Sequence, residues 1–429
     1  MEHVALEIAF LTMIGIYLLS SLFQKTLKIP LPHSLILLSY TIYYFKPELL
    51  NIHATENFDS IIFFLIPVIL MYDAMHLKWK DIKTYKWSIG YLAIFSVTVS
   101  IVLGSLLFHF GIFGAGLTIG MYVALFSMNM ATDAISVSNI FSQFKGVPHN
   151  IKVLVEGESL GNDATAMVAF YFIGLPWILN GTFDLSTIPF IAIKVFGLST
   201  LIGLSIGILG FLMLRKFNLF KEELLIILGV AYLTFSGAEI IHASGILALI
   251  IGVITFTTLV DLSITEENAQ VKINPENKKA LFKFLKKETT TKTNQKNIMN
   301  TLDTFSFMAV ILVFVSMASM INVSNLMHYW KEILIMFIAT SIIRFVVMAK
   351  FVLVGKATKA IDYVGTKGWV ILTLAGIKGS LSIIMLHAIP KTFEFYELFE
   401  SVTIGVILLS TFIYGILLLI YMSNLEKEV

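Results

Sequence analysis

The sequence predicts an all-α polytopic membrane protein, and three observations lead to this fold class. Hydrophobic residues make up 57% of the 429 residues and charged residues only 14%, which is too apolar for an ordinary soluble domain. The apolar residues form runs of about 18 or more, the length at which a helix crosses the hydrocarbon core of a bilayer. The basic residues are concentrated in alternate breaks between these runs. A disulfide framework is excluded, because the chain contains no cysteine.

Taken in order, the apolar runs predict about thirteen transmembrane helices. Their ranges are 4–23, 31–45, 59–77, 88–112, 117–142, 150–177, 186–213, 223–241, 244–260, 301–323, 332–349, 368–389 and 397–422. The first range lacks the basic segment that precedes the apolar core of a signal peptide, so it is interpreted as a span.

The distribution of charge predicts the orientation. Most of the 30 Lys and Arg residues lie in one set of alternating loops, whereas the opposite loops contain Lys46, Lys331 and Lys391. By the positive-inside rule, the N-terminus is outside and the C-terminus is cytoplasmic, in a multi-pass protein of the cell (inner) membrane. A net charge of +2 gives no indication of nucleic-acid binding.

A Lys-rich cytoplasmic loop is predicted at 261–300, between the ninth and tenth spans. Its segment Lys278–Lys287 fits a basic amphipathic helix on the anionic inner leaflet, and it fits a solvated linker equally well.

Acidic residues interrupt the apolar pattern in the fifth and sixth spans. They are Asp133, Glu156, Glu158 and Asp163. An acid at a helix centre that faces lipid costs roughly 2.5 to 3.5 kcal/mol. These side chains are therefore expected to face a protein or water-filled interior.

The sixth span carries its polar residues on one face. One stripe consists of Glu156, Ser159 and Asp163, and the neighbouring stripe of Glu158, Asn162 and Thr165. Carboxylate and hydroxyl oxygens one turn apart can bind a small desolvated cation. The alternative is that these groups only form hydrogen bonds with neighbouring helices. This alternative has more weight for Glu156 than for Asp163.

Two spans are predicted to be broken near the membrane midplane. The second half of 117–142 contains Asn129, Thr132, Asp133 and Ser136, and Gly376–Ser380 interrupts the span 368–389. A pair of interrupted helices in corresponding halves indicates an inverted repeat with a central site. Asp133 is expected to neutralise the exposed N-terminal helix ends and Lys378 the C-terminal ends.

Arg344 lies inside the eleventh span and needs an anionic partner, because a guanidinium does not lose its proton. The candidates are Glu156 and Glu158. We favour Glu158, which leaves Asp163 as the acid that exchanges ions.

In order and spacing, these motifs resemble the cation:proton antiporters of the NhaP and NHE type. The motifs are Thr132-Asp133, Glu156-Gly-Glu-Ser-Leu-Gly-Asn-Asp163, Arg344 and Gly376-Ile-Lys-Gly379. The resemblance implies an NhaA-like inverted-repeat fold of thirteen helices with broken helices 5 and 12, and a homodimer. It also implies a transporter rather than an enzyme, which exchanges Na⁺ or Li⁺ for H⁺ one for one and needs no cofactor.

The resemblance also implies roles for individual residues. Asp163 would carry the ion and the proton, and Asn162 would be the neutral neighbour that marks electroneutral members. The implied residues of the ion and proton site are Asp163, Asn162, Ser159, Glu158, Thr132 and Asp133. Of these, the implied Na⁺ ligands are Asp163, Ser159, Glu158 and Thr132. The implied structural charges are Arg344, which pairs with Glu158, and Lys378. Two positions depart from the family pattern, since a bulky residue is common at the place of Gly161 and an arginine at that of Lys378.

The predicted organisation is a single transmembrane domain, 1–429, that works by alternating access. Residues 88–177 and 332–422 would form an ion-translocation core that moves against a dimerisation panel of 4–77 and 223–323, with 186–213 as a linking helix.

Three alternatives remain at this point. One is a K⁺/H⁺ antiporter of the same fold, and another is a cation channel. The third is an intramembrane aspartyl protease that uses Asp133 and Asp163, but the Gly-Leu-Gly-Asp string of that class is missing. A phosphate-binding glycine loop is also missing, so ATP is not the expected energy source.

Overall fold

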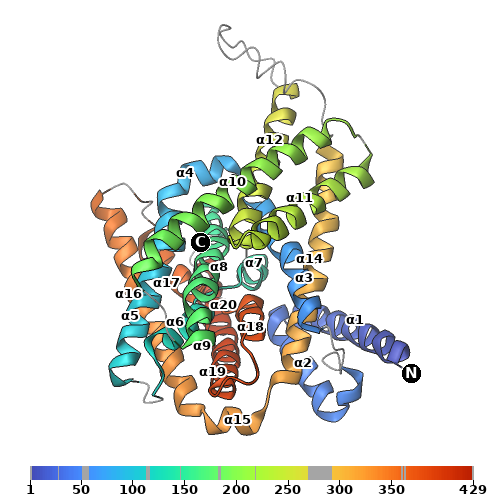
Figure 1. The fold of residues 1–429 in the computed structure, drawn as a ribbon. Coiled ribbons are helices and arrows are strands. Elements are labelled where there is room, and N and C mark those ends of the chain that lie inside the picture. The colour runs from blue at the N-terminus through green and yellow to red at the C-terminus, as the bar shows by residue number, and fades with distance from the viewer. Residues whose placement is uncertain are drawn as a thin grey trace. The chain divides into compact units, whose positions relative to one another are not determined.

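The computed structural model is helical throughout the residues it describes (Figure 1). These are residues 2–27, 29–50, 58–112, 116–144, 146–181, 185–217, 219–268, 292–358, 361 and 364–427. Within these ranges there is no strand, so the predicted all-α class is confirmed.

The helices of the first half are α1 (Glu2–Leu27), α2 (Leu31–Phe45), α3 (Phe58–His76), α4 (Trp79–Gly90), α5 (Ser96–Leu107), α6 (Ile119–Met128), α7 (Ala134–Phe141), α8 (His149–Ala169), α9 (Leu175–Asn180) and α10 (Ile188–Leu214). Those of the second half are α11 (Phe220–Ile240), α12 (Gly245–Asn268), α14 (Lys292–Met320), α15 (Val323–His328), α16 (Trp330–Thr358), α17 (Gly365–Leu374), α18 (Ser380–His387), α19 (Tyr396–Leu409) and α20 (Gly415–Lys427). Short π-helical segments continue some of them, namely η3 (Tyr91–Phe95), η4 (Phe108–Ile112), η5 (Phe170–Gly174) and η7 (Ser410–Tyr414). Two 3₁₀ turns are η1 (Pro47–Leu49) and η6 (Leu185–Thr187).

Each predicted span falls on a helix or on consecutive helices. Among the described residues, nine continuous helical segments are long and apolar enough to span a membrane by length and composition. The count of thirteen crossings therefore stays a prediction. The predicted loop 261–300 is shorter than expected, because α12 extends to Asn268 and α14 begins at Lys292; the segment Lys278–Lys287 lies outside the described residues.

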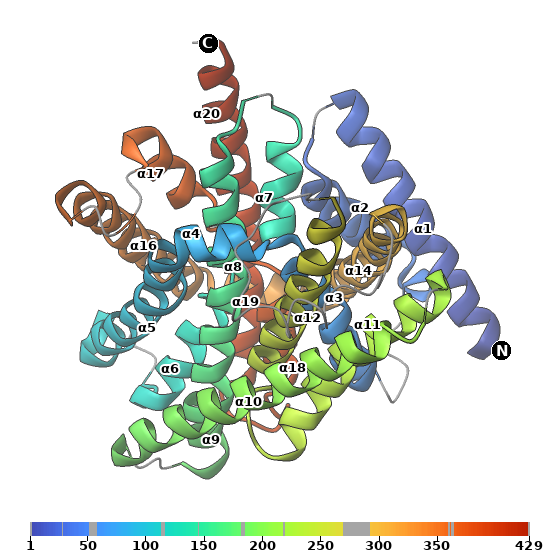
Figure 2. The same cartoon turned by 90° about the horizontal axis from the view of Figure 1, so that it is seen from above.

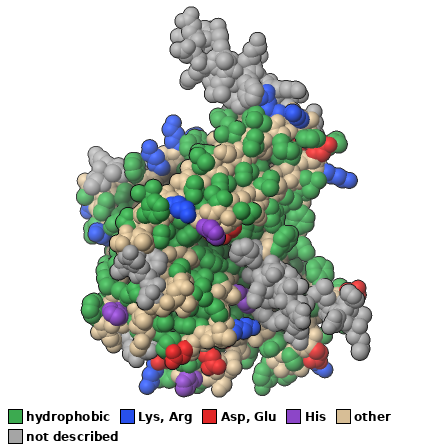
Figure 3. Space-filling model, in the orientation of Figure 1, with side chains coloured by type: hydrophobic (Ala, Val, Ile, Leu, Met, Phe, Trp, Pro, Cys, Tyr) green, Lys and Arg blue, Asp and Glu red, His purple; other side chains and the backbone are tan. Residues whose placement is uncertain are grey.

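Apolar side chains cover much of the surface, as the face in Figure 3 shows. Phe110, Phe190 and Ile193 are 82%, 70% and 75% exposed. A soluble monomer does not expose apolar surface on this scale. With the spanning helices, this surface indicates a multi-pass membrane protein.

The chain folds into two compact units, which differ from the predicted division into core and panel. The first unit is Met1–Phe63, Tyr85–Asp184 and Val310–Val429, and the second is Phe64–Thr84 and Leu185–Ala309. The first unit contains the predicted core ranges, but it also includes α1 and α2, which were expected in the panel. The second includes α10, the predicted linking helix. The functional division stays a prediction.

In the first unit, α8 packs against α6, α7 and η3, and α18 packs against α6 and α19. Figure 2 shows these helices as one bundle around α8. Buried apolar side chains from α8, α17 and α20, among them Leu154, Leu372 and Leu418, form a continuous core cluster. The polar face of α8 is thereby held inside the unit.

In the second unit, α10 packs closely along α12. A Cβ added at Gly203 would lie 2.6 Å from the carbonyl oxygen of Ala248, and one at Gly207 would lie 2.5 Å from that of Gly252. Glycines four residues apart allow two helix backbones to approach closely, as is typical of membrane helix pairs.

Candidate ion-binding site

Both predicted helix breaks are present, and the two breaks touch. The first break, residues 129–133, separates α6 from α7, and the second break, residues 375–379, separates α17 from α18. The backbone N–H of Asp133 donates to the carbonyl of Ile377 at 2.9 Å. Gly379 permits this approach, because an added Cβ would lie 2.6 Å from the Cβ of Asp133.

The first break is stable because side chains bind the backbone groups that it frees. Oδ1 of Asp133 accepts from the N–H of Ile135 at 3.0 Å, and Oδ2 accepts from the hydroxyl of Ser136. Asp133 therefore caps the N-terminus of α7, as expected, and a carboxylate there also complements the helix dipole. At the end of α6, the hydroxyl of Ser382 donates to the carbonyl of Met128 at 2.6 Å.

Two side chains of α8 attach that helix to the first break. The hydroxyl of Ser159 donates to the carbonyl of Thr132 at 2.8 Å and accepts from the N–H of Ala134 at 3.0 Å. The amide of Asn162 donates to Oγ1 of Thr132 at 2.6 Å and accepts from the N–H of Thr132 at 3.4 Å. Together they bind the unwound backbone on both sides of Thr132.

Asp163 follows Asn162 on α8 and is 3% exposed. The ammonium group of Lys378, 4% exposed, is attracted by the carboxylates of Glu158 and Asp163 and repelled by Arg344. The structure thus brings Asp163 and Lys378 into one buried charge cluster with Glu158 and Arg344.

Arg344 forms the ion pair expected from the sequence, with 2.7 Å between its Nη1 and Oε1 of Glu158. It also donates from Nε to the carbonyl of Thr373 at 3.1 Å and from Nη2 to the carbonyl of Leu372 at 2.7 Å. Arg344 therefore neutralises the C-terminal end of α17. The planar guanidinium reaches a carboxylate and two carbonyls at once. The expectation that Lys378 neutralises the C-terminal helix ends stays a prediction.

A small cavity lies beside the ion pair. It has a volume of about 20 Å³, and its lining includes Ser96, Ser100, Glu158, Arg344 and Lys378 together with apolar residues such as Leu92 and Met348. This volume is sufficient for about one water molecule, for which the polar residues offer hydrogen-bond partners. The ion pair can thus be hydrated inside the unit.

Gly161, where the sequence departs from the family pattern, lies where α8 meets η3. A Cβ at this position would collide with the Cβ of Ala93. The glycine therefore permits close packing of α8 against η3, within one turn of Glu158 and its ion pair. A bulky residue would require a wider spacing between these segments.

Two functional candidates were missed from the sequence, Ser382 and Ser410. Ser382 binds the end of α6, as described, and the hydroxyl of Ser410 accepts from the backbone N–H of Lys378 at 3.0 Å. In the sequence, each is only a hydroxyl within an apolar span. Serines on helices commonly donate to a carbonyl of their own helix, so such a hydroxyl does not by itself indicate a functional residue.

Comparisons with known proteins show the family to which the chain belongs. The family model described as "Sodium/hydrogen exchanger, transmembrane" matches residues 10–423. The chain belongs to this sodium/hydrogen exchanger family. It is accordingly a member of a transporter family and not of an enzyme family, and the resemblance inferred from the sequence is confirmed.

Relatives support the assignment along most of the chain. The Na⁺/H⁺ antiporter ApNhaP of Aphanothece halophytica is 25% identical over 412 residues, which are 94% of this chain and 71% of that protein. The sodium, potassium, lithium and rubidium/H⁺ antiporter of Bacillus subtilis is 28% identical over 210 residues, 48% of this chain and 31% of that protein. The structure of the sodium proton antiporter MjNhaP1 from Methanocaldococcus jannaschii superposes with a TM-score of 0.71 at 18% identity, covering 96% of this chain and 99% of that one. The predicted antiporter fold is therefore confirmed.

Proposed function

We propose that this protein exchanges Na⁺, or Li⁺, for H⁺ across the membrane, with Asp163 as the residue that binds either ion. The observation that carries the proposal is the burial of Asp163 on α8 directly beside the residues that bind the first break. A buried carboxylate at a helix break combines a charge for the cation with backbone and hydroxyl oxygens that can complete its coordination.

Exchange follows from competition. One carboxylate can bind a proton or a cation, and both leave the site with the same net charge. If the protein changes conformation only when a bound proton or cation neutralises the carboxylate of Asp163, each cation that moves in one direction is matched by one proton that moves in the other. The proposed exchange is therefore electroneutral and one for one, and it needs no cofactor beyond the transported ions.

The hydrogen bonds divide the predicted site residues into two groups. The hydroxyls of Ser159 and Thr132 each retain a lone pair for a cation, so we assign these two and Asp163 as Na⁺ ligands. Glu158 is held by Arg344, Asp133 caps α7 and Asn162 binds Thr132. We assign these three to shaping the site, with Arg344 and Lys378 as structural charges.

Alternating access would come from movement of 88–177 and 332–422 against a panel of 4–77 and 223–323, with 186–213 linking them. We further propose a homodimer in the cell (inner) membrane, with the N-terminus outside and the C-terminus in the cytoplasm, as the loop lysines indicate.

Potassium is the second candidate for the transported cation. A relative from Bacillus subtilis is named as an antiporter of sodium, potassium, lithium and rubidium, and all these ions bind oxygen ligands. A channel is disfavoured, because the family name describes exchange and a channel would conduct without countertransport.

Transport by purified protein in liposomes tests the proposal. An imposed Na⁺ gradient should drive an opposite proton flux in the wild type, and Asp163→Asn should abolish it while the protein still folds. Asp303→Asn, the same change at an exposed position of α14, is the matched control and should transport normally. Sodium-driven proton flux in Asp163→Asn would refute the proposal, and parallel assays with Li⁺ and K⁺ decide the cation.

A further inference from the structure

The second unit contains a basic cavity that the exchange mechanism does not use. It has a volume of about 890 Å³ and is lined by the start of α4 together with the facing ends of α12 and α14. Four lysines line it, Lys78, Lys80, Lys83 and Lys296, and all four are exposed. We call this site the basic cavity.

The lining of the basic cavity contains more basic than acidic residues. Asp261 is the acidic residue among the lining residues, and its Oδ1 accepts a hydrogen bond from the amide of Gln295 at 2.7 Å. The lining thus contains four lysines and one carboxylate. The cavity is suited to an anion with more than one negative oxygen, and phosphate esters have this property.

The basic cavity also has an apolar side. Met75, Trp79, Leu262 and Met299 belong to its lining, and Trp is the residue type that favours the membrane–water boundary. The cavity lining includes residues near the ends of two segments that are long and apolar enough to span a membrane, Gly245–Ser263 and Asn294–Met320. The ends of spanning helices are where the membrane–water boundary is expected.

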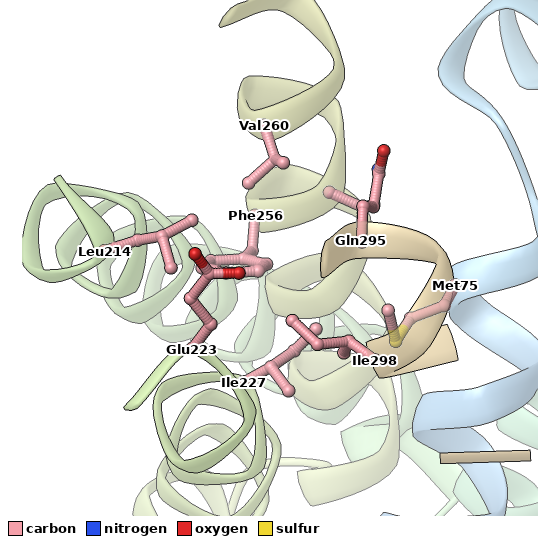
Figure 4. A pocket seen from close by; sticks show the side chains of 9 residues that line it. Met75, Leu214, Glu223, Ile227, Phe256, Val260, Gln295 and Ile298 are labelled. Atoms are coloured by element: carbon pink, nitrogen blue, oxygen red, sulfur yellow. The ribbon is translucent and has the colours of Figure 1, made fainter. Parts of the chain in front are cut away.

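A smaller and mostly apolar pocket adjoins it and shares Met75, Thr257 and Gln295 with its lining. Figure 4 shows Phe256 and Val260 from α12 and Ile227 from α11 pointing into this pocket. Its volume is about 30 Å³, which is too small for an acyl chain. Apolar parts of a ligand in the basic cavity would therefore lie along the outer surfaces of α12 and α14.

We propose that the basic cavity binds the headgroup of an anionic phospholipid, such as phosphatidylglycerol, whose acyl chains remain in the bilayer. A soluble phosphate compound would satisfy the lysines but would leave the apolar side without a partner, whereas a lipid satisfies both. The proposal does not depend on ion exchange. With the proposed orientation, this lipid would belong to the cytoplasmic leaflet, and only that assignment rests on the orientation.

The test uses the full chain in detergent, with bound lipid counted by native mass spectrometry and lipid-induced stabilisation measured by thermal unfolding. Phosphatidylglycerol should bind more tightly and stabilise more than phosphatidylcholine. The triple variant Lys80→Gln, Lys83→Gln and Lys296→Gln should weaken phosphatidylglycerol binding about 100-fold, since each lysine near an anionic headgroup contributes about a factor of five. The corresponding triple Arg variant should keep the binding.

A control with the same loss of charge is Lys25→Gln, Lys216→Gln and Lys221→Gln, which replaces exposed lysines elsewhere and should bind phosphatidylglycerol as the wild type does. The proposal is overturned if the Gln variant of the basic cavity keeps wild-type binding, or if phosphatidylcholine binds equally well. It is also overturned if inorganic phosphate alone reproduces the stabilisation, which would indicate a site for a soluble anion. Because transport is not measured, a failure here does not bear on the exchange proposal.

Discussion

Single polar side chains in the first unit replace helix hydrogen bonds that the two breaks remove. Ser159 is the clearest case, since its hydroxyl both donates to Thr132 and accepts from Ala134. A buried backbone group left without a partner costs about 1 to 3 kcal/mol. The same residues that could coordinate a cation thus also hold the site open in a non-helical conformation.

Ser159→Ala should therefore lower both stability and sodium affinity. We expect a loss of about 2 kcal/mol or more in the free energy of unfolding, because two buried backbone groups lose their partner. Thermal unfolding with and without Na⁺ measures both effects. Thr165→Ala is the control on the same helix, since its hydroxyl bonds only to the carbonyl of Gly161 and should be nearly neutral. Equal effects of the two substitutions would show that Ser159 has no special role.

The ion pair of Arg344 and Glu158 predicts a non-additive mutant cycle. Either single change, Arg344→Gln or Glu158→Gln, leaves one buried charge uncompensated and should cost about 3 to 5 kcal/mol. The double variant should be less destabilised than the sum of the two single variants. Unfolding in detergent checks this, and strict additivity would contradict a direct interaction.

At the scale of helices, the packing of α8 depends on small residues. Gly161 contacts Ala93 of η3 and has no room for a side chain, and Gly376 is equally restricted by the side chain of Arg344. These contacts join segments that are distant in the sequence. The first contact brings α8 close to η3, and the second brings the second break close to Arg344 of α16.

Gly161→Ala should destabilise the protein by about 1 to 3 kcal/mol through overpacking, although alanine is the better helix former. Adding Ala93→Gly should recover part of the loss, because it removes the colliding methyl group. Gly229→Ala is the control, since nothing lies within 4 Å of its added Cβ, and it should be neutral or stabilising. The packing argument fails if Gly161→Ala is tolerated as well as Gly229→Ala.

The helix breaks could be predicted from the sequence, and the way they are held could not. Polar residues and glycines inside apolar runs mark the positions of the breaks, because such residues are unfavourable inside a continuous membrane helix. The hydrogen bond from Asp133 to Ile377 and those from Arg344 to the end of α17 join residues far apart in the chain. The periodicity of apolar residues along the sequence does not indicate such contacts. For the same reason, the bonds from Arg344 to the last turn of α17 were not expected from the sequence.

At the scale of the whole molecule, the distribution of charge predicts the orientation of the chain in the membrane. The loops with many lysines and the loops with few alternate along the chain, which the positive-inside rule converts into an orientation. The exposed apolar side chains indicate which surface faces the lipid. The division into compact units was not predictable, because it depends on which helices pack and not on their individual hydrophobicity.

The absence of native cysteine allows the orientation to be tested directly. A single cysteine at Lys331 should react with a membrane-impermeant thiol reagent added to intact cells, whereas one at Lys216 should react only after the cells are opened. Both positions are exposed, so accessibility depends on the side of the membrane. The opposite pattern would invert the proposed orientation.

The most direct test of the account is the number of protons released when the purified protein binds sodium in a weakly buffered solution. Because one carboxyl group, that of Asp163, is proposed to hold either ion, the wild type should release about one proton per bound Na⁺ below the pKa of this group, and its apparent Kd for Na⁺ should rise about tenfold for each unit by which the pH falls there. Asp163→Asn should release none. Sodium binding with no proton release at any pH, or undiminished release from Asp163→Asn, would contradict the account.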